Sequence, residues 1–120
     1  MKKFLIHCTH GKEDTERATL PFIVANVAVT ADQDTTVFLT AEAVRIATRD
    51  YADGIQKDGM KPLKDVLQSF IQNGGRIWAC GACTGPRGIT DADLIPGAQI
   101  VTAVNLVEHL AEGAIPLTLT

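Results

Sequence analysis

Two cysteines three positions apart are the residues of this chain best suited to chemistry. They lie in the run Cys80-Gly81-Ala82-Cys83, directly after a short apolar segment. A cysteine thiolate is a strong nucleophile, and the C-x-x-C spacing occurs in redox pairs and in zinc sites. The chain has 3 cysteines, which is too few for a four-cysteine zinc site. A mixed site that adds Cys8 and a histidine remains an alternative, although we predict no metal and no other cofactor.

The residues that follow the pair favour a reactive thiol. Glycines in the segment 84–89 let backbone amides approach a sulfur, and Arg87 can supply positive charge. Both features stabilise a thiolate. Gly85-Pro86 prevents a long helix at this point, which argues against a thioredoxin-type site. We therefore expect a rigid turn that frames a reactive sulfur.

The predicted site consists of two cysteines and a small set of supporting residues. We predict Cys80 and Cys83 as the catalytic residues. The predicted pocket or thiolate-stabilising residues are Gly81, Ala82, Arg87 and His10. His10 follows the first predicted strand at the same sheet edge, and an ordinary exposed loop histidine is the alternative interpretation.

Other polar residues have more ordinary interpretations. Cys8 ends the first predicted strand, where a small buried side chain fits the core, since free cysteine is among the most buried residue types. Glu42 and Arg45 are expected to pair on the surface of a short helix. His109 is expected to face outward from the last long helix.

Strands and helices alternate along the chain. We predict strands over residues 2–9, 35–40 and 76–80, around 100–101 and over 115–119. Helices are predicted from about 14 or 15 to 30, with Pro21 bending the helix or marking its first turn, and over 41–48, 62–73 and 102–112. The segment 49–60 is expected to be a loop and a candidate lid. Alternating elements indicate a parallel sheet with helices on both faces, and Pro116 places the last strand at an edge.

Composition limits the remaining function classes. The 120 residues form one predicted domain, 1–120, with 46% hydrophobic and 21% charged residues. The net charge is -3, from 11 basic and 14 acidic side chains without a basic stripe, so we expect no nucleic-acid partner. The apolar stretch 18–31 is too short to span a membrane. The chain shows no export signal, and we predict a cytoplasmic location in which the thiols stay reduced.

Several motifs resemble one known family. Three stretches resemble the segment around the reactive cysteine of DsrE/DsrF-like sulfur-relay proteins, which are also labelled predicted peroxiredoxins. They are residues 77–83, the run Arg87-Gly88-Ile89 and residues 93–98. The similarity extends to residues 16–22 and 37–39, so it covers nearly the whole chain. Cys80 matches the position of the sulfur-carrying cysteine.

The resemblance implies both a fold and a function. It implies a three-layer α/β/α fold with a five-stranded parallel sheet, flavodoxin-like in appearance. It also implies a homo-oligomer, a trimer or a hexamer, that exchanges sulfur with donor and acceptor proteins or small persulfides. Cys80 would then carry sulfane sulfur as a persulfide, in the manner of a sulfurtransferase or sulfur carrier. The alternatives are a dithiol oxidoreductase that uses Cys80 and Cys83, and a non-enzymatic module that binds a small ligand.

Overall fold

Five parallel strands form one sheet in the computed structural model, which describes residues 1–119. The strands are β1 (Lys3–Cys8), β2 (Asp34–Leu39), β3 (Arg76–Cys80), β4 (Ala98–Val101) and β5 (Ile115–Thr118). They lie in the order β4-β3-β2-β1-β5, and each neighbouring pair is parallel. The predicted five-stranded parallel sheet is confirmed. The strand that contains Pro116 lies at an edge, as expected.

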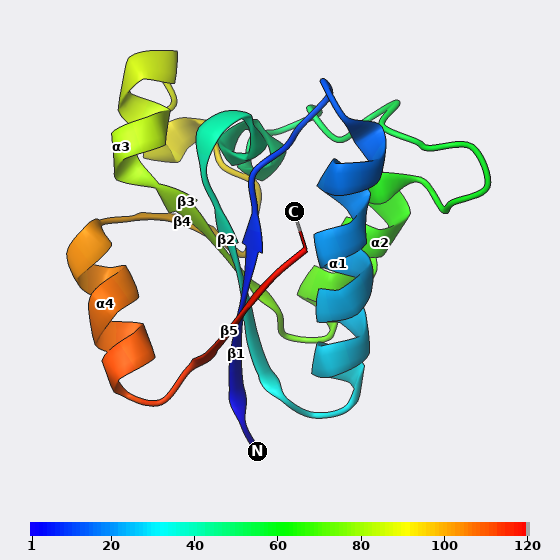
Figure 1. The fold of residues 1–120 in the computed structure, drawn as a ribbon. Coiled ribbons are helices and arrows are strands. Elements are labelled where there is room, and N and C mark those ends of the chain that lie inside the picture. The colour runs from blue at the N-terminus through cyan, green and yellow to red at the C-terminus, as the bar shows by residue number, and fades with distance from the viewer. Residues whose placement is uncertain (120) are drawn as a thin grey trace.

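Helices cover both faces of the sheet and give the molecule three layers (Figure 1). The helices α1 (Thr15–Thr30) and α2 (Leu63–Gln72) pack together on one face, and α4 (Ala103–Ala111) covers the other. Short helical segments complete the chain: η1 (Ala41–Ala47), α3 (Gly81–Thr84), η2 (Gly85–Arg87) and η3 (Asp91–Asp93). The predicted α/β/α class is therefore confirmed.

The start of α1 follows from a side-chain cap. The Asp14 carboxylate accepts a hydrogen bond from the Arg17 amide at 3.0 Å, which satisfies a donor that the helix itself leaves free. Pro21 lies inside the helix. The interpretation that Pro21 marks the first turn is therefore wrong, because the Asp14 cap begins the helix further upstream.

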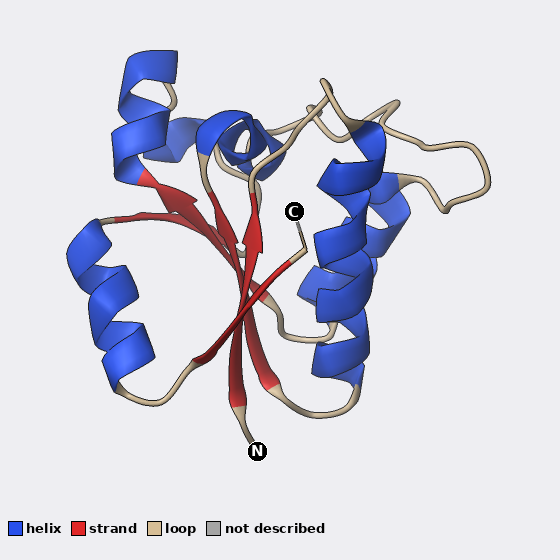
Figure 2. Ribbon diagram, in the orientation of Figure 1, coloured by secondary structure: helices blue, strands red, loops and turns tan. Residues whose placement is uncertain are grey.

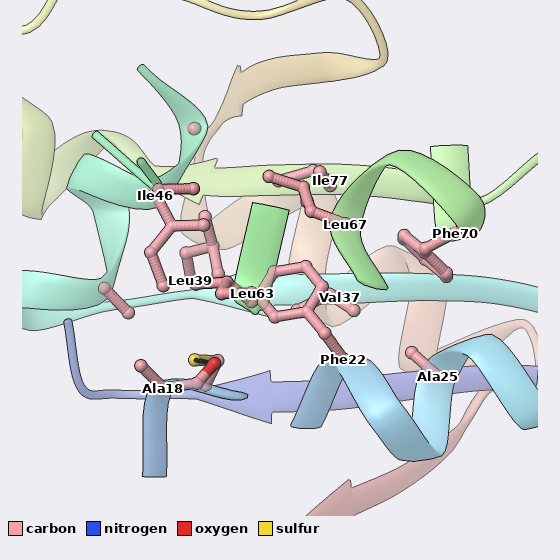
Figure 3. Packing of buried hydrophobic residues seen from close by; sticks show 14 of the residues in the cluster. Ala18, Phe22, Ala25, Val37, Leu39, Ile46, Leu63, Leu67, Phe70 and Ile77 are labelled. Carbon is pink, nitrogen blue, oxygen red and sulfur yellow. Dashed lines mark hydrogen bonds between the residues drawn. The ribbon is translucent and has the colours of Figure 1, made fainter. Parts of the chain in front are cut away.

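The main core lies between the sheet and the pair of helices α1 and α2 (Figure 3). Phe22 of α1 meets Phe70 of α2 edge to face, with ring centroids 6.1 Å apart. Both rings are fully buried, and burying such a side chain contributes about 1.5–3 kcal/mol. Cys8 belongs to this core with no exposed surface, as predicted. Burial raises the pKa of its thiol to about 12.

His109 does not face outward, and that prediction is wrong. Its side chain is 7% exposed and packs edge to face on Trp78, with ring centroids 4.9 Å apart. The position lies beside Leu106 and Leu110, the residues through which α4 contacts the sheet. The helix thus buries a polar ring, whose Nε2 has no hydrogen-bond partner among the described residues.

The predicted loop between η1 and α2 is present, and its centre belongs to the core. Ile55 is 1% exposed, and its carbonyl accepts a hydrogen bond from the Leu63 amide at 2.9 Å. Residues 56–59 are exposed and extend from the body of the molecule (Figure 2). No helix within residues 1–119 is long and apolar enough to cross a membrane.

Candidate functional site

The two cysteines lie at the carboxyl end of β3, where the strand turns into α3 (Figure 1). Cys80 is the N-cap of α3, with extended backbone angles, and Cys83 lies in its first turn. The helical path continues through η2 and stops at Gly88, whose φ of 68° is left-handed. As expected from Gly85-Pro86, no long helix follows the pair. In parallel α/β sheets this edge is where ligands and reactive groups gather.

Cys80 is partly exposed and contacts both apolar clusters of the molecule. The neighbouring Gly81 lies close to the end of β4. A Cβ at this position would stand 3.2 Å from the Val101 carbonyl oxygen and 3.6 Å from the Ile100 side chain. Glycine therefore allows β3 to turn tightly beside β4 and leaves the sulfur of Cys80 at the sheet edge.

A backbone amide in the connection after β2 binds the sulfur of Cys83. Its Sγ accepts a hydrogen bond from the Ala41 backbone amide at 3.2 Å. Ala41 follows the end of β2 and has a φ of 52°, a left-handed conformation that is costly for a residue with a Cβ. This backbone conformation directs the amide at a sulfur 42 positions along the chain.

Arg87 joins the cysteine turn to η1. Its Nε donates to a Glu42 carboxylate oxygen at 2.9 Å, and its Nη1 donates to the Cys83 carbonyl at 3.1 Å. Arg45 donates to the same carboxylate at 2.9 Å, so the expected pair of Glu42 and Arg45 is confirmed and extended. Hydrogen bonds from Arg87 and then from Arg45 lower the pKa of the Glu42 carboxyl. The guanidinium thus steadies the backbone of the turn, and its action on a thiolate stays a prediction.

His10 lies two strands away from Cys80, because β2 separates β1 from β3. Strand spacing of about 4.8 Å places the two strand ends roughly 10 Å apart. The His10 ring shares a hydrogen bond with the Thr9 hydroxyl at 2.8 Å. Within residues 1–119 no hydrogen bond joins His10 to Cys80 or Cys83, and a role in lining the pocket stays a prediction.

Two polar residues beside the site were missed in the sequence. His7 Nε2 shares a hydrogen bond of 2.7 Å with the Thr40 hydroxyl. Thr40 directly follows the Leu39–Ala79 pair in the register, which places it next to Cys80 across the sheet edge. Its hydroxyl therefore bonds His7 instead of capping η1. Burial lowers the pKa of His7.

A metal centre receives no support from these positions. Cys8 is enclosed in the core, where its thiol faces the carbonyls of His10 and Ala18 at 3.7 and 3.9 Å. Within residues 1–119, no group of three or more His, Cys, Asp or Glu side chains is arranged to hold a metal ion. The mixed site of three cysteines and a histidine is not assembled there.

An open parallel α/β sheet with a thiol-bearing turn at its carboxyl edge defines the general class of this protein. The model of the DsrE/DsrF-like family matches residues 2–119, and the chain belongs to this family. The resemblance seen in the sequence is thereby confirmed.

Relatives of known sequence are found among archaea. The chain is 26% identical over 109 residues to the uncharacterized protein MJ0760 of Methanocaldococcus jannaschii, covering 91% of this chain and 39% of that protein. It is 27% identical over 111 residues to MJ0989 of the same organism, covering 92% and 93% of the two chains. The chain thus spans well under half the length of MJ0760 and nearly the whole of MJ0989.

Solved structures share the fold. The YchN protein of E. coli superposes with a TM-score of 0.79 at 24% identity, and the match covers 99% of this chain and 100% of YchN. The protein MTH1491 of Methanobacterium thermoautotrophicum superposes with a TM-score of 0.72 at 18% identity, covering 99% and 100% of the two chains. At these identities the likeness shows the fold alone.

Proposed function

We propose that this protein carries sulfane sulfur as a persulfide on Cys80 and passes it to the thiol of a partner. The thiolate of Cys80 attacks the outer sulfur of a donor R–S–SH, which leaves as R–S⁻, and Cys80–S–SH forms. Attack by an acceptor thiolate on the outer sulfur then restores Cys80. Both steps are thiol exchanges at sulfur, and they need neither a metal nor an oxidant.

The observation that carries this proposal is the contrast between Cys80 and Cys8. Cys80 is partly exposed at the edge where α/β sheets bind ligands, whereas Cys8 is fully enclosed. Membership of the DsrE/DsrF-like family supports the same chemistry. A sulfur that exchanges with a second protein must be reachable, and the position of Cys80 meets that requirement.

The supporting residues have distinct proposed roles. Gly81 allows the close approach to Val101, and Arg87 holds the turn through the Cys83 carbonyl. The exposed Ala82 leaves the entrance to the sulfur unobstructed by a large side chain. His10 would line the wider edge on which a donor or an acceptor lands.

Sulfur donor and acceptor proteins or small persulfides are the proposed partners, in the cytoplasm, where thiols stay reduced. We also propose that the chain forms a homo-oligomer, a trimer or a hexamer. The outer side of α4 supports association, since Val104 and Val107 are each 63% exposed. On the edge strand β5, Ile115 and Leu117 are 42% and 38% exposed. Sedimentation of the purified chain tests this copy number.

Transfer to an acceptor tests the function. The protein is loaded with a small persulfide under anaerobic conditions, freed of donor and mixed with a small acceptor thiol. We expect the acceptor to gain sulfur from the loaded protein, at most one atom per chain, and Cys80→Ser protein to deliver none. Equal delivery by the Cys80→Ser protein would show that the sulfur travels on another group.

A further inference from the structure

Cys80 and Cys83 lie three residues apart in one short turn. One is the N-cap of α3 and the other lies three residues later in its first turn. Two helical residues with this spacing have Cβ atoms about 5–6 Å apart, and a disulfide requires about 3.5–4.5 Å, so a change in the turn of this order is what the pair needs. Both thiols are free and partly exposed. A bond between them therefore requires a local movement and no rearrangement of the sheet.

Groups outside its own turn fix the position of Cys83. The Ala41 amide donates a hydrogen bond to its Sγ at 3.2 Å and fixes the position of the sulfur. Arg87 holds the carbonyl of the same residue at 3.1 Å, and Glu42 holds Arg87 at 2.9 Å. Both the sulfur and the backbone of Cys83 are thus fixed to the β2–η1 connection, while Cys80 ends β3. The two sulfurs therefore differ in their surroundings, since the sulfur of Cys83 is anchored by another segment and, within residues 1–119, that of Cys80 is not.

We infer that Cys83 gives the protein a second activity, the reductive release of hydrosulfide from the Cys80 persulfide. This inference rests on the proposed function, because it requires the persulfide to form on Cys80. The Cys83 thiolate attacks the inner sulfur of Cys80–S–SH, the S–S bond to the outer sulfur breaks, and the electron pair leaves with HS⁻. A Cys80–Cys83 disulfide remains.

The atoms and electrons of this step balance within the protein. The sulfane sulfur is reduced by two electrons, and the two cysteines are oxidised by two electrons to the disulfide. A dithiol protein of the thioredoxin class, or two molecules of glutathione, then returns the pair to thiols and is itself oxidised to a disulfide. Sulfur that meets an acceptor is relayed, and sulfur that meets none is discharged as hydrosulfide.

The remaining cysteine does not serve this purpose. Cys8 has no exposed surface, and desolvation raises the pKa of its thiol to about 12. It therefore stays protonated and enclosed under conditions in which the other two sulfurs react. Cys8→Ala protein provides a control that has lost a cysteine and retains the reacting pair.

A single turnover without reductant tests the inference. Wild type, Cys83→Ser, Cys83→Ala and Cys8→Ala proteins are loaded anaerobically with a small persulfide and freed of donor. Hydrosulfide is trapped with a fluorescent bimane, and the intact mass is followed over time. Serine at position 83 is close in size to cysteine and can accept the Ala41 hydrogen bond, so this variant is expected to keep the fold.

We expect wild type and Cys8→Ala proteins to release hydrosulfide and to end about 2 Da below the reduced mass, as a disulfide does. Both variants at position 83 should retain a gain of about 32 Da per sulfur and lose the release of hydrosulfide, because the attacking thiol is absent. If wild type keeps its sulfur as long as the variants do, the inference fails and the proposed function stands. If no protein gains sulfur, both fail.

Discussion

Replacing Gly81 with alanine should destabilise the cysteine turn, whereas the same change at Gly85 should not. A Cβ on residue 81 would stand 3.2 Å from the Val101 carbonyl oxygen and 3.6 Å from Ile100. The first distance is a few tenths of an ångström shorter than an ordinary contact, and the crowding atom is strand backbone, which yields little. A Cβ on residue 85 would meet nothing within 4 Å apart from its neighbours in the chain.

The expected magnitudes follow from these contacts. Overpacking of this kind costs about 1–3 kcal/mol, and the lower entropy of alanine in the unfolded chain offsets about 0.4–1 kcal/mol. We therefore expect Gly81→Ala to lower the free energy of unfolding by about 1–2 kcal/mol. Gly85 has helical angles, φ -55° and ψ -56°. Because residue 85 precedes Pro86, a Cβ in this helical conformation is crowded by the proline ring. This crowding opposes the entropic gain of about 0.4–1 kcal/mol, so the replacement should leave the free energy of unfolding nearly unchanged.

Urea unfolding, followed through the fluorescence of the single tryptophan, Trp78, measures both variants against wild type. The tryptophan lies on β3, two residues before Cys80, and reports on the strand that carries the turn. Equal free energies of unfolding for the two alanine variants would refute the close approach of Gly81 to β4.

Three further results are expected. Burial lowers the pKa of His109, so the stability that its neutral ring contributes is present above the unfolded pKa of about 6.5 and is lost as the pH falls through the folded pKa. His109→Leu should therefore weaken the pH dependence of the urea unfolding midpoint between about pH 7.5 and 5. It should also raise the free energy of unfolding by about 1 kcal/mol, because it removes a buried polar ring without a hydrogen-bond partner in residues 1–119. Iodoacetamide at about pH 8 should modify Cys80 and Cys83 in the folded protein and Cys8 only after unfolding, and modification of folded Cys8 would contradict its burial. Glu42→Gln should change stability by less than about 1 kcal/mol, since the carboxylate is partly exposed. It should also slow hydrosulfide release, because Arg87 loses an anchor; an unchanged rate of release would show that this anchor does not matter.

Much of the fold was predictable from local patterns. The apolar run before Cys80 and the repeat of buried residues at Leu63, Val66, Leu67 and Phe70 predict β3 and α2 closely. Gly74, with a φ of 93°, ends that helix as its position in the sequence indicates. These elements are determined by residues that are close together in the sequence, so they can be predicted from it.

The contacts around Cys83 were not predictable in the same way. Ala41 acts through its backbone amide, which every residue except proline has, so its side chain gives no signal. The bond between Glu42 and Arg87 joins residues 45 positions apart, and only the packing of η1 against the cysteine turn brings them together. The burial of His109 was predicted wrongly because this residue lies at the edge of the apolar face of α4, beside Leu106 and Leu110. A polar residue at such an edge can be either buried or exposed.

The site of sulfur attachment tests the central claim most directly. Cys83→Ser and Cys80→Ser proteins are incubated anaerobically with a persulfide donor, and their intact masses are compared before and after reductant. We expect a gain of about 32 Da per sulfur on the protein that retains Cys80, reversed by reductant, and no gain on the protein that lacks it. An equal gain on the Cys80→Ser protein would contradict the assignment of Cys80 as the sulfur carrier.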